Sequence, residues 1–150
     1  MTDACYPCSV NALLPDAPLR EAMVVEGGWR VAHAFDTSLP GWLVVVPTRH
    51  VTAMDELSDD EARHLGALLR PLSAALREVT GCEKTYVMLF AEQEGFAHLH
   101  VHVVPRMAWF TPEQLGPRVF EFLGSASADA LGESERDDMA ARIRCAMEDA

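Results

Sequence analysis

The sequence predicts an α+β protein whose sheet is mostly antiparallel. Apolar runs of strand length come before and after one long amphipathic pattern, in the order ββ(β)αββ. A chain of 150 residues is long enough to bury a core without disulfides or other cross-links. We therefore expect one domain over residues 1–150.

The first strands are predicted by turn residues and by apolar runs. Residues 23–36 fit two strands around Glu26-Gly27-Gly28, because paired glycines favour a tight hairpin turn. The run "WLVVVP" over residues 42–47 follows the turn Pro40-Gly41. Its nearly continuous apolar character predicts a strand that is covered on both faces and ends at Pro47.

The main helix is predicted over the Ser58–Gly81 region. Ser58 and Glu61 have the spacing of a capping box, and Gly81 is a typical helix stop. Apolar residues recur between them at helical spacing: Leu65, Leu68, Leu69, Leu72, Leu76 and Val79. Pro71 lies inside this pattern and predicts a kink or a break into two pieces.

The second half of the chain contributes two more strands and a second helix. Residues 84–90 and 98–104 are predicted strands. Residues 111–128 show no regular pattern, and a short amphipathic helix is expected over residues 133–147.

Composition and charge exclude several classes of function. The formal charge is −11, and an acidic surface repels phosphate backbones, so we expect no nucleic-acid partner. A small phosphorylated ligand in a local pocket is compatible with this charge. There is no apolar run that could span a membrane and no pattern of a secretory signal, so a cytoplasmic protein without a membrane partner is expected.

The stretch "AHLHVHVVPR" carries the strongest functional signal. His98, His100 and His102 stand at every second position, so on a strand their side chains share one face. Between them, apolar residues would enter the core: Leu99, Val101 and Val103. A single histidine is more often a plain polar residue, but three in strict alternation are hard to explain by stability.

Two chemistries fit this row of imidazoles. In one, a His-x-His pair binds a catalytic metal with an open coordination position. In the other, one imidazole is a nucleophile that forms a covalent intermediate, while the others orient it or handle protons. Spacing by itself does not choose between them.

A cysteine pair adds a second signal. Cys5 and Cys8 form a Cys-x-x-Cys pattern, which in a reducing compartment indicates metal or redox chemistry more than a structural disulfide.

The segment "HLHVHVV" resembles the signature of the histidine triad (HIT) superfamily of nucleotide hydrolases and transferases. The segment "GWLVVVPTRHV" is similar to the family's strand that runs through Val-Pro to a further histidine, His50. The segment "CYPC" resembles the N-terminal cysteine pair of the zinc-bearing branch, which includes bacterial HIT nucleotide hydrolases. The resemblance covers residues 3–110 and implies a HIT-like fold and a homodimer.

The resemblance also implies a mechanism. His100 corresponds to the histidine that attacks the α-phosphorus of a nucleotide and forms a nucleotidyl-histidine, and His102 to the histidine that assists proton transfer. Water or another acceptor then resolves the intermediate, and the chemical step needs no metal. The expected function is a nucleotide-phosphate hydrolase or transferase that releases a nucleoside monophosphate from a phosphoanhydride or phosphoramidate.

The zinc-bearing branch implies a structural zinc ion held by a Cys₂His₂ set. The corresponding residues are Cys5, Cys8, His50 and His98. Such a site would attach the N-terminal segment to two strands. The alternative is a reduced cysteine pair without a ligand, with both histidines merely polar neighbours.

The loop before the triad departs from the family pattern. Many members have an Asn and a Gly-Gln-Ser-like loop that contacts phosphate, whereas residues 92–97 read "EQEGFA". Gly95 falls at the position of a phosphate-contacting Ser. Asp36 is the candidate for the family's ribose-binding acid, and the alternative is a plain turn residue. Carboxylates that point inward would repel a polyphosphate, whereas loop carboxylates more often point to solvent. A less charged substrate, such as a nucleoside phosphoramidate or an adenylylated adduct, is less affected by this departure.

Two other functions stay open from the sequence. One is a metal-dependent hydrolase that uses the histidine strand as its ligands. The other is a nucleotide-binding module that keeps the triad without turnover, which the altered loop would explain.

Overall fold

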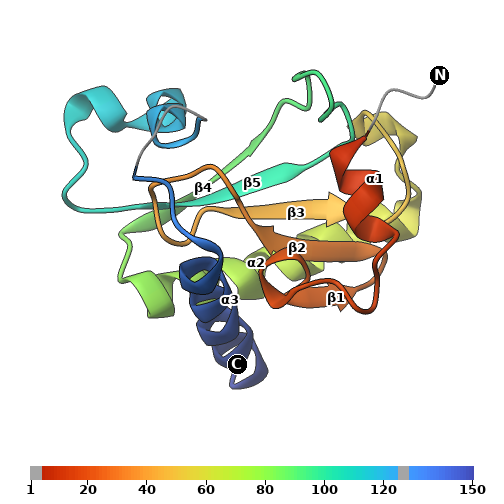
Figure 1. Cartoon of the computed structure of the whole chain (residues 1–150), viewed down its shortest axis with the longest axis horizontal. Coiled ribbons are helices and arrows are strands. Elements are labelled where there is room, and N and C mark those ends of the chain that lie inside the picture. The colour runs from red at the N-terminus through yellow and green to blue at the C-terminus, as the bar shows by residue number, and fades with distance from the viewer. Residues whose placement is uncertain (1–4, 125–128) are drawn as a thin grey trace.

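A five-stranded antiparallel sheet lies at the centre of the computed structural model, which describes residues 5–124 and 129–150 (Figure 1). The strand order is β1-β2-β3-β5-β4, and every neighbouring pair is antiparallel. The strands are β1 (Val24–Glu26), β2 (Trp29–His33), β3 (Leu43–Pro47), β4 (Lys84–Leu89) and β5 (Val101–Arg106). The predicted α+β class and the antiparallel sheet are confirmed.

The hairpin between β1 and β2 forms where the glycine pair predicts it. Gly27 and Gly28 have φ angles of 57° and 84°, so both central residues of the turn are left-handed. This is the geometry of a two-residue hairpin turn that follows the twist of the strands. Glu26 then pairs directly with Trp29 across the turn.

Helix α2 (Asp59–Thr80) has the predicted ends. The Ser58 hydroxyl accepts from the Glu61 N–H at 3.1 Å, and the Ser58 N–H donates to the Glu61 carboxylate at 2.8 Å. Gly81 ends the helix with a φ of 71°. The helix continues through Pro71, so the predicted break into two pieces is wrong. Packing of a long apolar stripe against the sheet outweighs the backbone hydrogen bond that proline removes.

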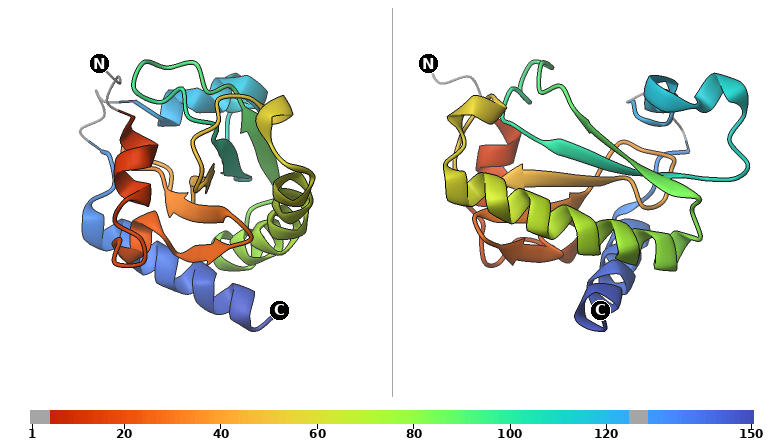
Figure 2. Two further views of the ribbon diagram at one scale, coloured as in Figure 1. Left: turned by 90° about the vertical axis from the view of Figure 1, so that its right-hand side faces the viewer. Right: turned by 180° about the vertical axis from the view of Figure 1, so that it is seen from behind.

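One face of the sheet packs against helices. Figure 2 shows α2 lying across this face, with the C-terminal helix α3 (Glu133–Glu148) packed against α2. The main core cluster lies here, and it includes Val31, Val45, Val101, Val103, Leu68, Leu72 and Ile143. Helix α3 confirms the predicted C-terminal helix.

The opposite face of the sheet is covered by short elements. At one end lies α1 (Tyr6–Asn11), and at the other lie two 3₁₀-helices, η3 (Pro112–Gln114) and η4 (Gly116–Phe122) (Figure 1). The pattern over residues 111–128 predicted irregular structure. Its described part instead holds these two short helices, and residues 125–128 lie outside the described residues. Three other helices are too short for apolar periodicity to predict: α1, η1 (Leu19–Glu21) and η2 (Met54–Glu56).

The strand predicted over residues 98–104 begins only at Val101. The Leu99 N–H donates to the Val51 carbonyl at 2.7 Å, away from the β3–β5 ladder. The alternation still holds, because Leu99, Val101 and Val103 are all buried in the main core as predicted. Among the described residues, no helix is long and apolar enough to cross a membrane.

Candidate active site and metal centre

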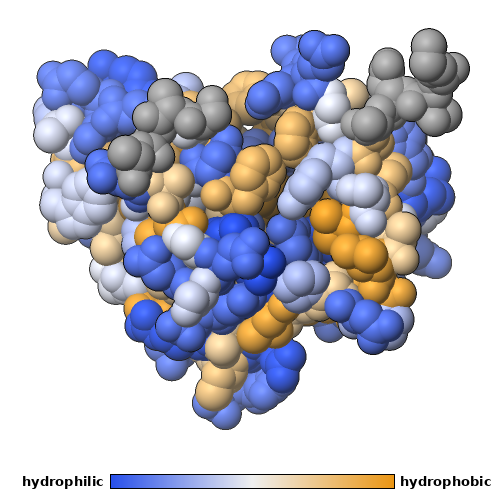
Figure 3. Space-filling model, viewed as in Figure 1, coloured by the Kyte–Doolittle hydropathy of each residue, from blue (hydrophilic) through white to orange (hydrophobic). Residues whose placement is uncertain are grey.

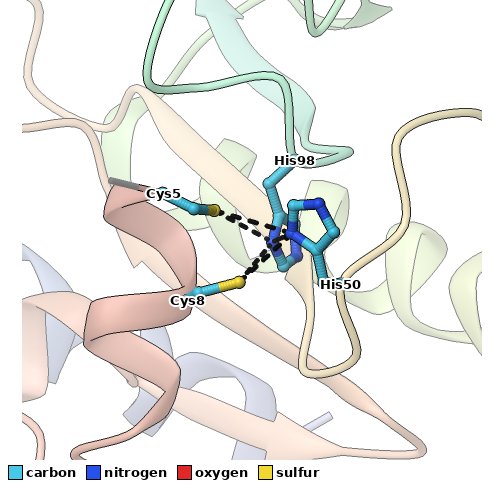
Figure 4. Close-up of side chains that lie close together, drawn as sticks. All are labelled: Cys5, Cys8, His50 and His98. Carbon is cyan, nitrogen blue, oxygen red and sulfur yellow. Dashed lines mark hydrogen bonds between the residues drawn. The ribbon is translucent and has the colours of Figure 1, made fainter. Parts of the chain in front are cut away.

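Four predicted metal ligands come together at one edge of the molecule. Cys5 and Cys8 come from the start of α1, His50 from the loop after β3, and His98 from the segment that leads into β5 (Figure 4). Their ligand atoms all lie within 4.8 Å of one another. His98 is fully buried and His50 is exposed, so the cluster sits at the surface and its inner side is closed.

The distances within this cluster fit a tetrahedral ion. Each cysteine sulfur lies 3.2–3.6 Å from the Nδ1 atoms of the two histidines. The two Nδ1 atoms are 3.2 Å apart. A zinc ion with bonds of about 2.3 Å to sulfur and about 2.0 Å to nitrogen would separate its ligands by about 3.3 to 3.8 Å. The donor set and the spacing therefore fit zinc.

Hydrogen bonds outside the cluster orient the buried ligand. The His98 Nε2–H donates to the Pro47 carbonyl at 2.8 Å, which leaves Nδ1 unprotonated toward the cluster. This is how ligating histidines are usually held in metal sites. The Asn11 amide also donates to the Pro47 carbonyl, at 3.1 Å, and its oxygen accepts from Arg30 Nε at 2.6 Å. Helix α1 is thus fixed to the sheet by side-chain hydrogen bonds as well as by the cluster.

A cavity of about 570 Å³ opens beside this cluster, on the sheet face that α2 does not cover. Figure 3 shows this face, with a hollow bordered by apolar side chains near its centre. Small residues of β2 and β3 form the floor, because alternate side chains of each strand point to this face. The floor residues are Ala32, Val44 and Val46.

His100 lies in the cavity with one ring nitrogen already occupied. Its Nδ1–H donates to the backbone carbonyl of His98 at 2.8 Å. A neutral imidazole with its proton on Nδ1 has a lone pair on Nε2. His100 is partly exposed and lines the cavity, so this lone pair is available to a bound molecule.

His102 also lines the cavity, but its ring is held differently. Its Nδ1 accepts from the Trp42 indole N–H at 3.0 Å. Phe120 of η4 packs edge-on against the His102 ring, at 5.3 Å between ring centroids. His102 is 6% exposed, and burial lowers its pKa to about 4, with a smaller contribution from His100. It is therefore neutral at pH 7.

The loop before the triad lies along the mouth of the cavity. Glu92 and Gln93 line the cavity, whereas Gly95 is not among its lining residues. The Gly95 carbonyl accepts from the Tyr6 N–H at 3.2 Å, which ties the loop to α1. Ala91, at the start of the loop, lines the cavity with a φ of 56°, in the left-handed region that alanine rarely adopts.

Asp36 lines the cavity near a group of aromatic rings. Phe35 stacks on Phe96 at a centroid distance of 5.9 Å, and Tyr6 contacts both rings. The Asp36 carbonyl accepts from the Gly124 N–H at 2.9 Å, so the segment after η4 is attached beside it. An aromatic surface next to a carboxylate can bind a nucleobase and a ribose.

The charges of the cavity are mainly acidic. Glu21, Asp36 and Glu92 line it, and Arg30 is the one lysine or arginine among the residues found to line it. Arg30 is already paired with Glu21, at 3.7 Å between charged atoms, and bound to Asn11. A ligand with several phosphates would find little compensating charge here.

Comparison with known proteins identifies the family. The HIT domain profile matches residues 26–108, which is more than half of the chain. The chain belongs to the HIT domain family. This match includes His50 and the whole histidine row, whereas the two cysteines of the metal cluster lie before it.

Solved HIT structures share the fold. A histidine triad protein from Sinorhizobium meliloti is 29% identical, with a TM-score of 0.67, over 82% of this chain and 86% of that one. A zinc-bound histidine triad family protein from Mycobacterium smegmatis is 16% identical, with a TM-score of 0.67, over 97% and 94%. A hypothetical histidine triad nucleotide-binding protein from Sulfolobus tokodaii is 16% identical, with a TM-score of 0.70, over 97% and 93%. No curated protein matches significantly.

The sequence analysis missed several residues of the site. Trp42 and Phe120 lie against His102, and Arg30 lies in the cavity wall. Trp42 follows a turn glycine directly before a strand, and nothing in that pattern indicates a contact with residue 102. An arginine within a predicted strand that is otherwise largely apolar is the one signal that the sequence offered for Arg30.

Proposed function

We propose that this HIT protein is a nucleotide-phosphate hydrolase or transferase that forms a covalent nucleotidyl intermediate on His100. The observation that carries the proposal is the hydrogen bond from His100 Nδ1–H to the His98 carbonyl in the wall of the cavity. It holds His100 in the tautomer whose Nε2 can act as a nucleophile.

In the proposed first step, the Nε2 lone pair of His100 attacks the α-phosphorus of the nucleotide. The N–P bond forms while the bond to the leaving group breaks and its electron pair leaves with that group. The His100 ring becomes positively charged, and the His98 carbonyl stabilises this charge through the Nδ1–H. Water then attacks phosphorus and loses a proton to the solvent, the N–P bond breaks with its electron pair returning to His100 Nε2, and a nucleoside monophosphate is released.

The charge of the cavity favours one class of substrate. A dinucleoside polyphosphate would bring several negative charges close to Glu92 and Asp36. A phosphoramidate carries only one phosphate, and its leaving group is an amine. We therefore propose a nucleoside phosphoramidate or an adenylylated adduct as substrate, with Asp36 accepting from the ribose hydroxyls.

The zinc ion belongs to the structural part of this proposal. Cys5, Cys8, His50 and His98 would hold it, and when bound it would cross-link α1 to the two segments that carry the histidines.

Gly95 would act through its contact with α1, by placing the loop at the cavity mouth.

The geometry does not favour a catalytic metal on the histidine row. The Nδ1 of His100 is occupied by a carbonyl, and that of His102 by Trp42. Of the three histidines in the row, only His98 belongs to the group of potential metal ligands found among the described residues. The three imidazoles therefore do not converge on one ion.

We also propose that residues 1–150 form one domain that pairs as a homodimer in the cytoplasm. Helix α3 packs on α2, which supports one domain. Strand β4 is an edge of the sheet, and Val87 on it is 50% exposed, which supports pairing through this edge. Free cysteine thiols that bind zinc fit a reducing compartment.

The test is detection of the intermediate. Rapid quench of the protein with adenosine 5′-phosphoramidate, followed by peptide mass spectrometry, should find the adenylyl group on His100. His100→Ala should lower turnover at least about 1,000-fold with unchanged thermal stability. His64→Ala is the matched control, because His64 is exposed on α2, and it should keep full turnover.

Two results would contradict the proposal. Unchanged turnover in His100→Ala would exclude His100 as the nucleophile. Tight nucleotide binding without any product in the wild-type protein would instead support the binding module that keeps the triad without turnover.

A further inference from the structure

The contact between Trp42 and His102 joins two buried rings. The indole Nε1 lies 3.0 Å from the imidazole Nδ1. Trp42 is fully buried and His102 is 6% exposed. The two rings meet edge to face at 89°, with 5.8 Å between their centroids. Phe120 packs against both rings, at 5.4 Å and 5.3 Å, and restricts their rotation.

This contact has only one possible direction. An indole nitrogen donates and never accepts, so the Nδ1 of His102 must be the acceptor and must be unprotonated. A neutral imidazole then carries its proton on Nε2. The contact therefore fixes the tautomer of His102, which is the reverse of the His100 tautomer with its proton on Nδ1.

We propose that Trp42 is a positioning residue that fixes His102 as a neutral Nε2–H donor, so that His102 stabilises the reacting phosphoryl group by a hydrogen bond and does not transfer a proton. This inference rests on the proposed function for its catalytic part. It changes the role expected from the family resemblance, in which the third histidine assists proton transfer.

Proton balance supports this assignment. If His102 gave its Nε2 proton to the leaving group, the ring would become an anion, because Trp42 has no proton to supply to Nδ1. In the proposed step, His100 Nε2 attacks phosphorus and the P–N bond of the phosphoramidate breaks. The electron pair of that bond goes to the leaving nitrogen. The leaving nitrogen departs as a neutral amine, with the proton that it took up from water before the attack.

Surrounding groups also keep His102 neutral. His100 is the titratable group that faces it, and a positive charge on His100 after the attack would disfavour a second one on His102. Trp42 and Phe120 cover other sides of the ring and offer no negative charge. A proton on Nδ1 would also point at the indole N–H and break that hydrogen bond.

The tautomer is measured directly in the unmodified protein. In ¹⁵N-histidine-labelled wild type at pH 7, NMR should show His102 with an unprotonated Nδ1 and a protonated Nε2. A protonated Nδ1 on His102, in either the neutral or the cationic ring, would overturn the proposal. This measurement needs neither substrate nor variant, so it is independent of the proposed function.

Variants separate hydrogen-bond donation from proton transfer. Trp42→Phe should lower kcat about 10-fold with little change in KM, and its His102 should show a mixture of tautomers. Val119→Ala, which loses packing in the same buried cluster, should keep the wild-type tautomer and kcat. Equal kcat values in these two variants would overturn the positioning role.

The type of side chain at position 102 gives the second kinetic test. His102→Gln offers an amide N–H that donates but does not titrate, and it should retain at least about 10-fold more turnover than His102→Ala. Equal loss in both would show that proton transfer, and not donation, is the role of His102. If the wild type itself turns over no nucleotide, the proposed function fails, while the NMR result still decides the tautomer.

Discussion

The metal cluster and the cavity use neighbouring histidines of one row in different ways. His98 donates from Nε2 to the Pro47 carbonyl and presents Nδ1 to two cysteines and a second histidine. His100 donates from Nδ1 to a carbonyl and presents Nε2 to the cavity. His102 accepts at Nδ1 from an indole. The partner of one ring nitrogen thus decides what the other nitrogen can do.

The two regions also differ in what they connect. The metal cluster joins three segments that are far apart in the sequence, and none of its four residues is among those lining the cavity. The cavity lies over a preformed sheet face and is closed by η4 and the loop before β5. We therefore expect changes in the cluster to affect mainly stability, and changes in the cavity to affect mainly chemistry.

The largest effect on stability is expected from loss of the metal cluster. Cys8→Ala should abolish stoichiometric zinc binding and lower the free energy of unfolding by several kcal/mol, because the proposed ion would cross-link α1 to the sheet. Atomic emission measures the zinc content, and unfolding in urea measures the free energy of unfolding. Cys145→Ala, at an exposed cysteine of α3, is the control and should change neither. A zinc content of one per chain in Cys8→Ala would contradict the assignment.

A second effect on stability is expected from protonation of the buried His33 ring in acid. Burial lowers the pKa of His33 to about 4, where its Nδ1–H donates to the Ala34 carbonyl and its Nε2 accepts from the Gly41 N–H. The unfolded chain takes up this proton near pH 6.5, so the folded state loses stability as the pH falls from about 6.5 to 4. The loss for this one ring is about 3 kcal/mol at most.

The comparison with His33→Asn isolates this loss. The wild type should be the more stable protein at pH 7, and its advantage in the free energy of unfolding should shrink toward pH 4. Both proteins keep the same metal cluster, so acid release of zinc cancels in the difference. A constant difference between pH 7 and pH 4 would show that His33 titrates normally in the folded protein.

The smallest effect concerns the strained start of the cavity loop. Ala91 has a φ of 56°, which costs an alanine about 1 kcal/mol relative to glycine. Ala91→Gly should therefore raise the free energy of unfolding by up to about 1 kcal/mol, in spite of the greater flexibility of the unfolded chain. Ala67→Gly, on the exposed side of α2, should lower it by about as much. A change of the same sign in both variants would contradict strain at Ala91.

The sequence predicted those parts of the fold that depend on local patterns. The capping box at Ser58, the glycine turn between β1 and β2, and the burial of Leu99 between two histidines all follow from spacing. Helix α1 escaped prediction because six residues are too few for apolar periodicity. The start of β5 at Val101 was missed because the hydrogen bond of Leu99 to Val51 is not a local feature.

For the site, the sequence determined which residue types are available, and the tertiary structure decided what each one does. The Cys-x-x-Cys pair and the histidine row are visible in the printed letters, and so is the family that they resemble. The partner of each ring nitrogen is not, because Trp42 and His102 are 60 residues apart and meet only through the pairing of β3 with β5. Tautomers depend on such contacts and on burial, and both exist only in the folded chain.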